Sequence, residues 1–93
     1  MAVARIVNFE GVDKGRMDQM KQDMENGDPP EGFPPSELVV LHDGADSSMV
    51  MVIFENEDDY QKGDEILNAM PSEDTPGRRT SVKKYDVAMH MKS

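Results

Sequence analysis

The sequence predicts an α+β domain in which a four-stranded antiparallel sheet carries two helices on one face. Three observations predict it. Ninety-three residues suffice for one domain. Apolar and β-branched residues gather in short segments with strand periodicity, whereas two polar segments between them have helical spacing. The segments follow the order strand, helix, strand, strand, helix, strand, and this sheet is the economical way to bury them.

The first predicted strand covers residues 2–9, and the first helix covers about 14–26. Asp13 is a good N-cap for that helix, and Asn26-Gly27 supplies its end. Apolar residues alternate along the strand, whereas methionines recur at helical spacing in the helix. Val3, Val7 and Phe9 lie on one face of the strand, and Ala4 and Ile6 lie on the other. The helix methionines are Met17, Met20 and Met24.

The next segment, 28–37, is rich in proline and therefore cannot itself form a helix or a central strand. Its one large apolar residue, Phe33, belongs either to a lid over a cavity or to a stiff connection packed on the sheet edge. Residues 37–43 and 48–55 are both predicted strands. Asp43-Gly44 between them is a turn signal, so the pair reads as an antiparallel hairpin.

The length of the hairpin loop decides which hairpin residues share a face. An even-length loop predicts two sets of neighbours, and an odd loop or a bulge would change them. Both of these sets are apolar, so both faces of the hairpin should be buried. The first set is Leu38, Val40 and His42 with Met49, Met51 and Ile53, and the second is Val39 and Leu41 with Val50, Val52 and Phe54.

Asn56 is a suitable N-cap for a second helix that Pro71 ends. A loop at 71–79 and a last strand at 80–92 complete the chain. The apolar face of this helix consists of Tyr60, Gly63, Ile66, Leu67 and Met70.

This βαββαβ order is the ferredoxin-like arrangement, and residues 1–93 form a single such domain. The two helices can cover only one face of the sheet. Because the hairpin is apolar on both faces, something else must cover the second face. In so short a chain the natural candidate is a second copy, so we expect a homodimer.

Composition excludes several classes of function. Cysteine is absent, which excludes disulfide scaffolds, cysteine nucleophiles and cysteine-ligated metal centres. A formal net charge of −9 argues against nucleic-acid or anionic-membrane binding. No apolar run is long enough to span a membrane, and no signal peptide is recognisable, so we expect a cytoplasmic protein.

In element order, length and two-faced strands, essentially the whole chain resembles the dimeric α/β-barrel superfamily. The segment TPGRRTSVKKYDV (75–87) is similar to a stretch of its small uncharacterised members. The resemblance implies a dimer whose open sheet faces enclose a cavity. The superfamily includes cofactor-free monooxygenases, isomerase-like proteins and haem-degrading enzymes. The last use a catalytic tryptophan, which this chain lacks, and no catalytic motif of the other branches matches.

Two histidines and a tyrosine are the candidate catalytic residues. His42 and His90 both fall in predicted strands, and either could act as a general base if it faced a cavity. Tyr85 could donate a hydrogen bond to a substrate. Each also has an ordinary structural interpretation, as a strand-end histidine or an interface tyrosine. No metal-binding spacing and no nucleotide-binding glycine motif occurs, so we expect neither a metal nor a cofactor.

The candidate ligand-binding residues are Arg5, Tyr60 and Phe33. Arg5 interrupts an apolar strand, and a buried arginine needs either a carboxylate partner or an anionic ligand. Asp86 in the neighbouring last strand is the expected partner if the role of Arg5 is structural. Tyr60 could equally be a core tyrosine.

Basic residues concentrate near the end of the chain. Residues 78–93 carry five basic and one acidic residue, whereas residues 1–77 carry five basic and 18 acidic residues. The cluster could bind an anion or an acidic partner, or it could complement the acidic helix 57–65. Its members are Arg78, Arg79, Lys83 and Lys84.

Three functions remain open from the sequence. The first is a homodimer that binds a small apolar or aromatic ligand between its sheets. The second is a cofactor-independent monooxygenase-like or isomerase-like enzyme. The third is a protein-interaction module that uses its charged surface.

Overall fold

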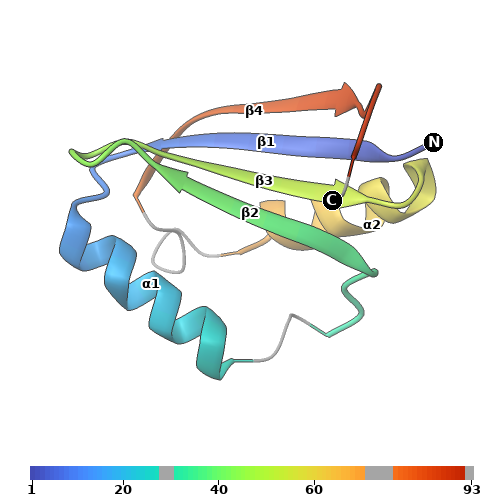
Figure 1. Cartoon of the computed structure of the whole chain (residues 1–93). Helices are drawn as coiled ribbons and strands as arrows, with labels where there is room; N and C mark the ends of the chain where they lie inside the picture. The colour runs from blue at the N-terminus through green and yellow to red at the C-terminus, as the bar shows by residue number, and fades with distance from the viewer. Residues whose placement is uncertain (28–30, 71–76, 92–93) are drawn as a thin grey trace.

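The structure is a computed structural model that describes residues 1–27, 31–70 and 77–91. Six elements follow one another in the predicted order, and the bounds of all but the last strand lie close to the expected ones (Figure 1). They are β1 (Val3–Glu10), α1 (Lys14–Asn26), β2 (Ser36–His42), β3 (Ser48–Phe54), α2 (Glu57–Asn68) and β4 (Arg78–Asp86).

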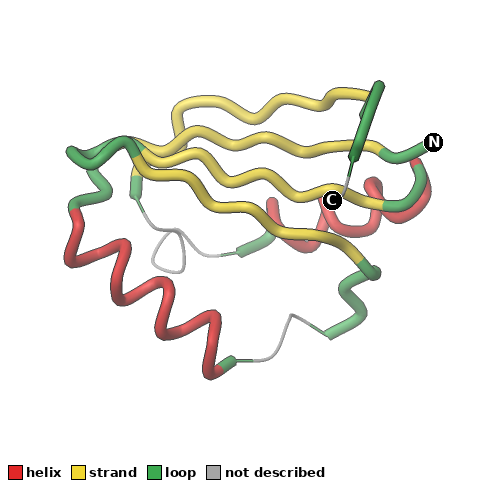
Figure 2. Tube along the Cα trace, in the orientation of Figure 1, coloured by secondary structure: helices red, strands yellow, loops and turns green. Residues whose placement is uncertain are grey.

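The four strands form one antiparallel sheet in the order β2-β3-β1-β4. β1 pairs with both β3 and β4, which places it beside the last strand, as expected. Both helices lie on the same side of the sheet (Figure 2). The α+β class and the ferredoxin-like βαββαβ fold are therefore confirmed.

Side-chain caps fix where both helices begin. The carboxylate of Asp13 accepts a hydrogen bond from the Arg16 backbone N–H, and the Asn56 amide oxygen accepts one from Asp59. Each cap satisfies a backbone donor that the first helical turn leaves without a partner. Both predicted N-caps are confirmed. The α2 helix ends at Asn68, and the expected stop at Pro71 lies outside the described residues.

The core lies between the sheet and α2. Phe54 is fully buried there, and its ring packs at 5.8 Å from both Phe33 and Tyr60. A second cluster holds Val7, Phe9 and Val12, with Met17 packed against it. Phe33 therefore packs against the core rather than standing apart from it.

The α1 helix is held less closely than its methionine spacing suggests. It buries none of its residues, and Met24 is 43% exposed. Leu38 of β2, which faces the helix side of the sheet, is 44% exposed as well. The interior of this domain is therefore built mainly by β1, β3 and α2.

The expected pairing of faces in the hairpin was wrong. His42 pairs with Ser48, so the loop holds five residues, 43–47, and its length is odd. Leu38 and Val40 consequently face the helices with Val50, Val52 and Phe54. The other face carries Val39 and Leu41 with Met49, Met51 and Ile53.

The last strand is shorter than expected, because β4 ends at Asp86 rather than near residue 92. Its neighbour among the described strands, β1, begins at Val3, which pairs with Asp86. Beyond that pair, one hydrogen bond from the Val87 N–H to the Ala2 carbonyl remains. The following residues 87–91, here called the tail, leave the sheet edge and cross toward β2 (Figure 1).

One face of the sheet carries no helix, and we call it the open face. The strand registers arrange its side chains in three rows that run from β4 across β1 and β3 to β2. Most of them are apolar, although no helix buries them. The rows are Tyr85–Ala4–Ile53–Glu37, Lys83–Ile6–Met51–Val39 and Ser81–Asn8–Met49–Leu41.

Candidate functional site

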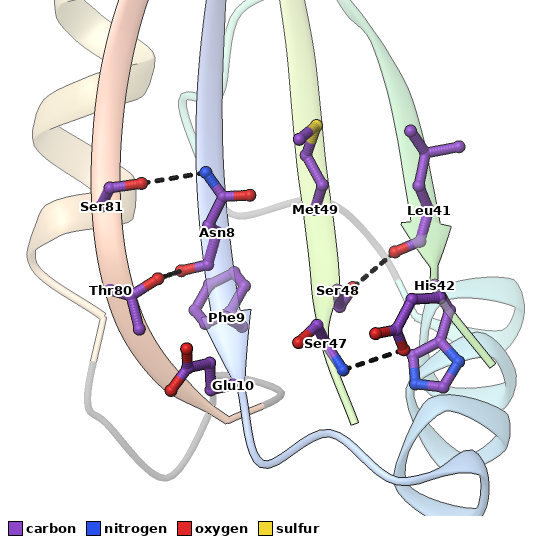
Figure 3. A pocket seen from close by; sticks show the side chains of 11 residues that line it. Asn8, Phe9, Glu10, Leu41, His42, Ser47, Ser48, Met49, Thr80 and Ser81 are labelled. Atoms are coloured by element: carbon purple, nitrogen blue, oxygen red, sulfur yellow. Dashed lines mark hydrogen bonds between the residues drawn. The ribbon is translucent and has the colours of Figure 1, made fainter. Parts of the chain in front are cut away.

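A hollow of about 490 Å³ lies at the end of the sheet where the β2–β3 hairpin turns (Figure 3). Leu41 and Met49 supply its apolar side, and Asn8 and Ser81 line it from the two neighbouring strands. These four residues form the third row of the open face. The third row of the open face therefore borders the hollow, which also reaches Phe9, His42 and Ser48 at the end of the sheet.

Two hydrogen bonds hold the polar side of the hollow. The Asn8 amide nitrogen donates to the Ser81 hydroxyl at 2.9 Å, and the Thr80 hydroxyl donates to the Asn8 carbonyl at 3.2 Å. The register of β4 shifts beside Asn8, which brings Thr80 and Ser81 to this point (Figure 3). The Asn8 amide oxygen and the Ser81 hydroxyl proton can still bond a neutral ligand group.

The hairpin loop shapes the opposite rim. Asp43 accepts hydrogen bonds from the backbone N–H groups of Ala45 and Ser47, at 2.8 and 3.1 Å. Gly44 has a φ of 86°, a conformation that glycine adopts without strain. The Val12 N–H also donates to the Asp46 carbonyl, which ties the loop to the β1–α1 connection. These bonds make the odd-length loop a defined turn.

The loop predicts a pH-dependent stability. The backbone N–H groups of Ala45 and Ser47 hold the pKa of the Asp43 carboxyl below its usual value. A lowered folded-state pKa adds stability above the unfolded pKa of about 3.9, and this stability is lost as the pH falls through the folded value. We therefore expect Asp43→Asn to melt below the wild type at pH 7, with the difference closing in acid.

Melting curves across pH 2–7 check this expectation, because the closing of the difference identifies the carboxylate as its source. Asp46→Asn is the control, since it removes the same charge from the same loop. A gap between wild type and Asp43→Asn that stays constant through the acid range would contradict the assigned role of the carboxylate.

His42 lines the hollow, but both of its ring nitrogens are engaged. Nε2 lies 2.6 Å from the Val12 carbonyl, and Nδ1 accepts from the Gly44 N–H at 3.2 Å. The carbonyl contact requires a proton on Nε2, so Nδ1 is the acceptor of a neutral ring. This geometry fits the structural interpretation of His42, which joins β2 to the β1–α1 connection.

His90 and Tyr85 lie away from the hollow. The prediction that His90 lies in a strand was wrong, because β4 ends at Asp86 and His90 is in the tail, with Nε2 3.5 Å from a carboxylate oxygen of Glu37. Tyr85 is on the open face at the same end of the sheet and is 49% exposed. The three catalytic candidates therefore do not converge on one point.

Arg5, Tyr60 and Phe33 lie on the helix side of the sheet, opposite the hollow. Arg5 is 4% exposed and donates to Asp64 at 2.9 Å and to Asn68 at 2.8 Å. The prediction that Asp86 is its partner was wrong, because α2, which packs on the helix side of the sheet, supplies the carboxylate of Asp64. Tyr60 packs edge-on against Phe54, and burial raises the pKa of its hydroxyl. These contacts fit the structural interpretations.

Three of the four clustered cations have partners within the chain. Arg78 pairs with Glu10 at 2.5 Å, and Arg79 donates to Asn68 at 3.3 Å. Lys84 pairs with Glu57 and lies 5.1 Å above the Tyr60 ring. The hydrogen bond from Lys84 lowers the pKa of Glu57, and the same bond raises the pKa of Lys84. The pair confirms contact between the basic cluster and the acidic helix.

Lys83 differs from the other three cations. It points to the open face, where its cross-strand neighbour is Ile6. It forms no ion pair with any carboxylate in the described part of the chain.

Apart from His42, the residues that line the hollow were not among the candidates predicted from the sequence. Asn8 and Ser81 are polar residues inside predicted strands, and only the register of β1 with β4 brings them together. Leu41 and Met49 were expected on opposite faces because the loop length was unknown. An odd loop would have placed these two residues together, so loop length was the missing signal.

Searches for similar proteins found no known family that matches the chain. No curated protein shows significant similarity to it. Among residues 1–27, 31–70 and 77–91, no group of three or more His, Asp or Glu side chains is arranged to hold a metal ion. None of the described helices is long and apolar enough to cross a membrane.

Proposed function

We propose that the protein is a homodimer of the dimeric α/β-barrel kind, which binds a small apolar or aromatic ligand between its two open sheet faces. The observation that carries this proposal is the open face itself. It is largely apolar, it has no helix over it, and it is hollowed at one end.

The exposed apolar side chains on this face support a partner. Val39 and Leu41 are 38% and 52% exposed, and Tyr85 at the other edge is 49% exposed. Exposed apolar side chains gathered on one face of a sheet are typical of a binding face. A second copy would bury the face without requiring any other protein, because one two-fold axis makes the surface self-complementary.

The hollow supports a ligand with a neutral polar group. Its apolar side, formed by Leu41 and Met49, suits an aromatic or aliphatic body. Asn8 and Ser81 offer one acceptor and one donor for a hydroxyl, carbonyl or amide group. Ligand binding therefore explains both the apolar and the polar residues of the site.

The same geometry favours binding over catalysis. A general base must reach its substrate, and the His42 nitrogens are already bonded to backbone groups. His90 lies at the other end of the open face, beside Glu37. The interaction-module alternative is weakened too, because Arg78, Arg79 and Lys84 have partners within the chain.

Thermal denaturation with small apolar probes tests this function. We expect 1-naphthol, indole or decanol to raise the melting temperature of the wild type, because a ligand stabilises the state that binds it. Met49→Lys should abolish the rise by placing a charge on the apolar side of the hollow. Met24→Lys is the matched control, since Met24 is already 43% exposed on α1.

The outcomes separate ligand binding from general stickiness. A rise that survives in Met49→Lys would place the ligand elsewhere. No rise with any probe in the wild type would contradict small-molecule binding on this face.

A further inference from the structure

We infer that the two copies pack with β2 of one over β4 of the other, and that Lys83 pairs across the interface with Glu37 of the second copy. This inference rests on the proposed homodimer and adds its orientation. The evidence is the placement of charge on the open face.

The three rows of the open face carry two opposite charges, one on each edge of the sheet, and His90 of the tail lies 3.5 Å from the acidic one, Glu37. Lys83 projects from β4 in the middle row, and Glu37 projects from β2 in the adjacent row. Of the other ten residues in the rows, eight are apolar and two are neutral and polar. A partner that covers the face must therefore neutralise Lys83 in largely apolar surroundings, because burial of an unpaired charge is costly.

Two simple two-fold arrangements can bring the open faces together. An axis parallel to the strands places β2 over the partner's β4, so Glu37 of each copy approaches Lys83 of the other. An axis across the strands places β4 over β4, so the two Lys83 side chains approach each other. Facing sheets lie about 10 Å apart, a distance that lysine and glutamate can bridge together. Opposite charges favour the first arrangement, and like charges penalise the second.

The favoured orientation also brings the two hollows together. An axis parallel to the strands keeps the same end of both sheets on the same side. The hollows beside Met49 then face each other, and the tails beside Glu37 meet at the opposite end. The arrangement across the strands would instead place each tail against the partner's hollow. The arrangement with the axis parallel to the strands therefore creates one shared cavity that is open at the hairpin end.

Charge reversal tests the orientation, with the dimer dissociation constant measured by sedimentation equilibrium. Lys83→Glu and Glu37→Lys should each raise this constant by about tenfold or more, since each creates like charges at two symmetric contacts. The double variant Lys83→Glu/Glu37→Lys should return it to within about threefold of the wild type. Lys21→Glu on exposed α1 controls for the change in net charge.

Crosslinking gives a second readout that does not depend on the strength of the dimer. The chain has no cysteine, so introduced thiols are unique. A short bis-maleimide should join Glu37→Cys to Lys83→Cys when the two variants are mixed, and it should join neither variant to itself. Self-crosslinking of Lys83→Cys would identify the arrangement across the strands.

Three results would overturn the orientation. They are single reversals that leave the dissociation constant unchanged, a double variant in which the two effects add, and crosslinking of Lys83→Cys to itself. A wild type that is monomeric throughout would instead contradict the proposed homodimer. If only Lys83→Glu weakens the dimer, a ligand anion rather than Glu37 neutralises the lysine, and the ion pair is wrong.

Discussion

Replacement of Asp64 by alanine should reduce the free energy of unfolding by about 3 kcal/mol, because it leaves a buried guanidinium without its counter-charge. The Arg5 side chain is 5% exposed, and its Nε lies 2.9 Å from a carboxylate oxygen of Asp64. Asn68 would remain as a neutral acceptor at 2.8 Å. An amide oxygen stabilises a buried cation less than a carboxylate does.

Arg5→Met should cost less than half as much, because the Asp64 side chain is 30% exposed and water can solvate it when the arginine is gone. Urea denaturation at one fixed protein concentration measures both variants, since a dimer's stability depends on concentration. Asp58→Ala on the exposed side of α2 should change stability by less than about 0.5 kcal/mol. Equal losses in Asp64→Ala and Arg5→Met would contradict this description of the pair.

Gly63→Ala should destabilise the protein by about 2–3 kcal/mol, although alanine is the better helix former. A Cβ at Gly63 would overlap Cε1 and Cζ of Phe54. The Phe54 ring is fully buried between Phe33 and Tyr60, so it has little room to retreat. The helix must move away from the sheet instead, which also strains the Arg5–Asp64 contact one residue further along α2.

Gly15→Ala is the matched control in the other helix. A Cβ there would meet only a carboxylate oxygen of Asp13 at 3.5 Å, an ordinary contact. Helix propensity then decides the result, and we expect a gain of up to about 1 kcal/mol. A stabilising Gly63→Ala, measured by the same urea denaturation, would show that α2 is not packed closely on Phe54.

Periodicity and capping residues made the element order predictable from the sequence. Asp13 and Asn56 identify the starts of both helices, because their side chains satisfy local backbone donors that any such helix exposes. The environment of Arg5 was predicted only in part. The need for a carboxylate was evident from the sequence, but its source depended on how α2 lies over β1.

Long-range register could not be predicted, and the site depends on it. Asp43-Gly44 signals a turn, but the two hydrogen bonds that Asp43 accepts lengthen the loop to five residues. Because the loop has this odd number of residues, Leu41 lies on the same face as Met49. The extent of β4 likewise depended on its neighbour, since β1 begins at Val3 and none of the described strands pairs with the chain beyond Val87.

The central claim is that a second copy covers the open face, and sedimentation equilibrium of the unmodified protein tests it most directly. We expect a mass of twice the 10.4 kDa chain at micromolar concentration. A mass of one chain across the micromolar range would contradict the claim.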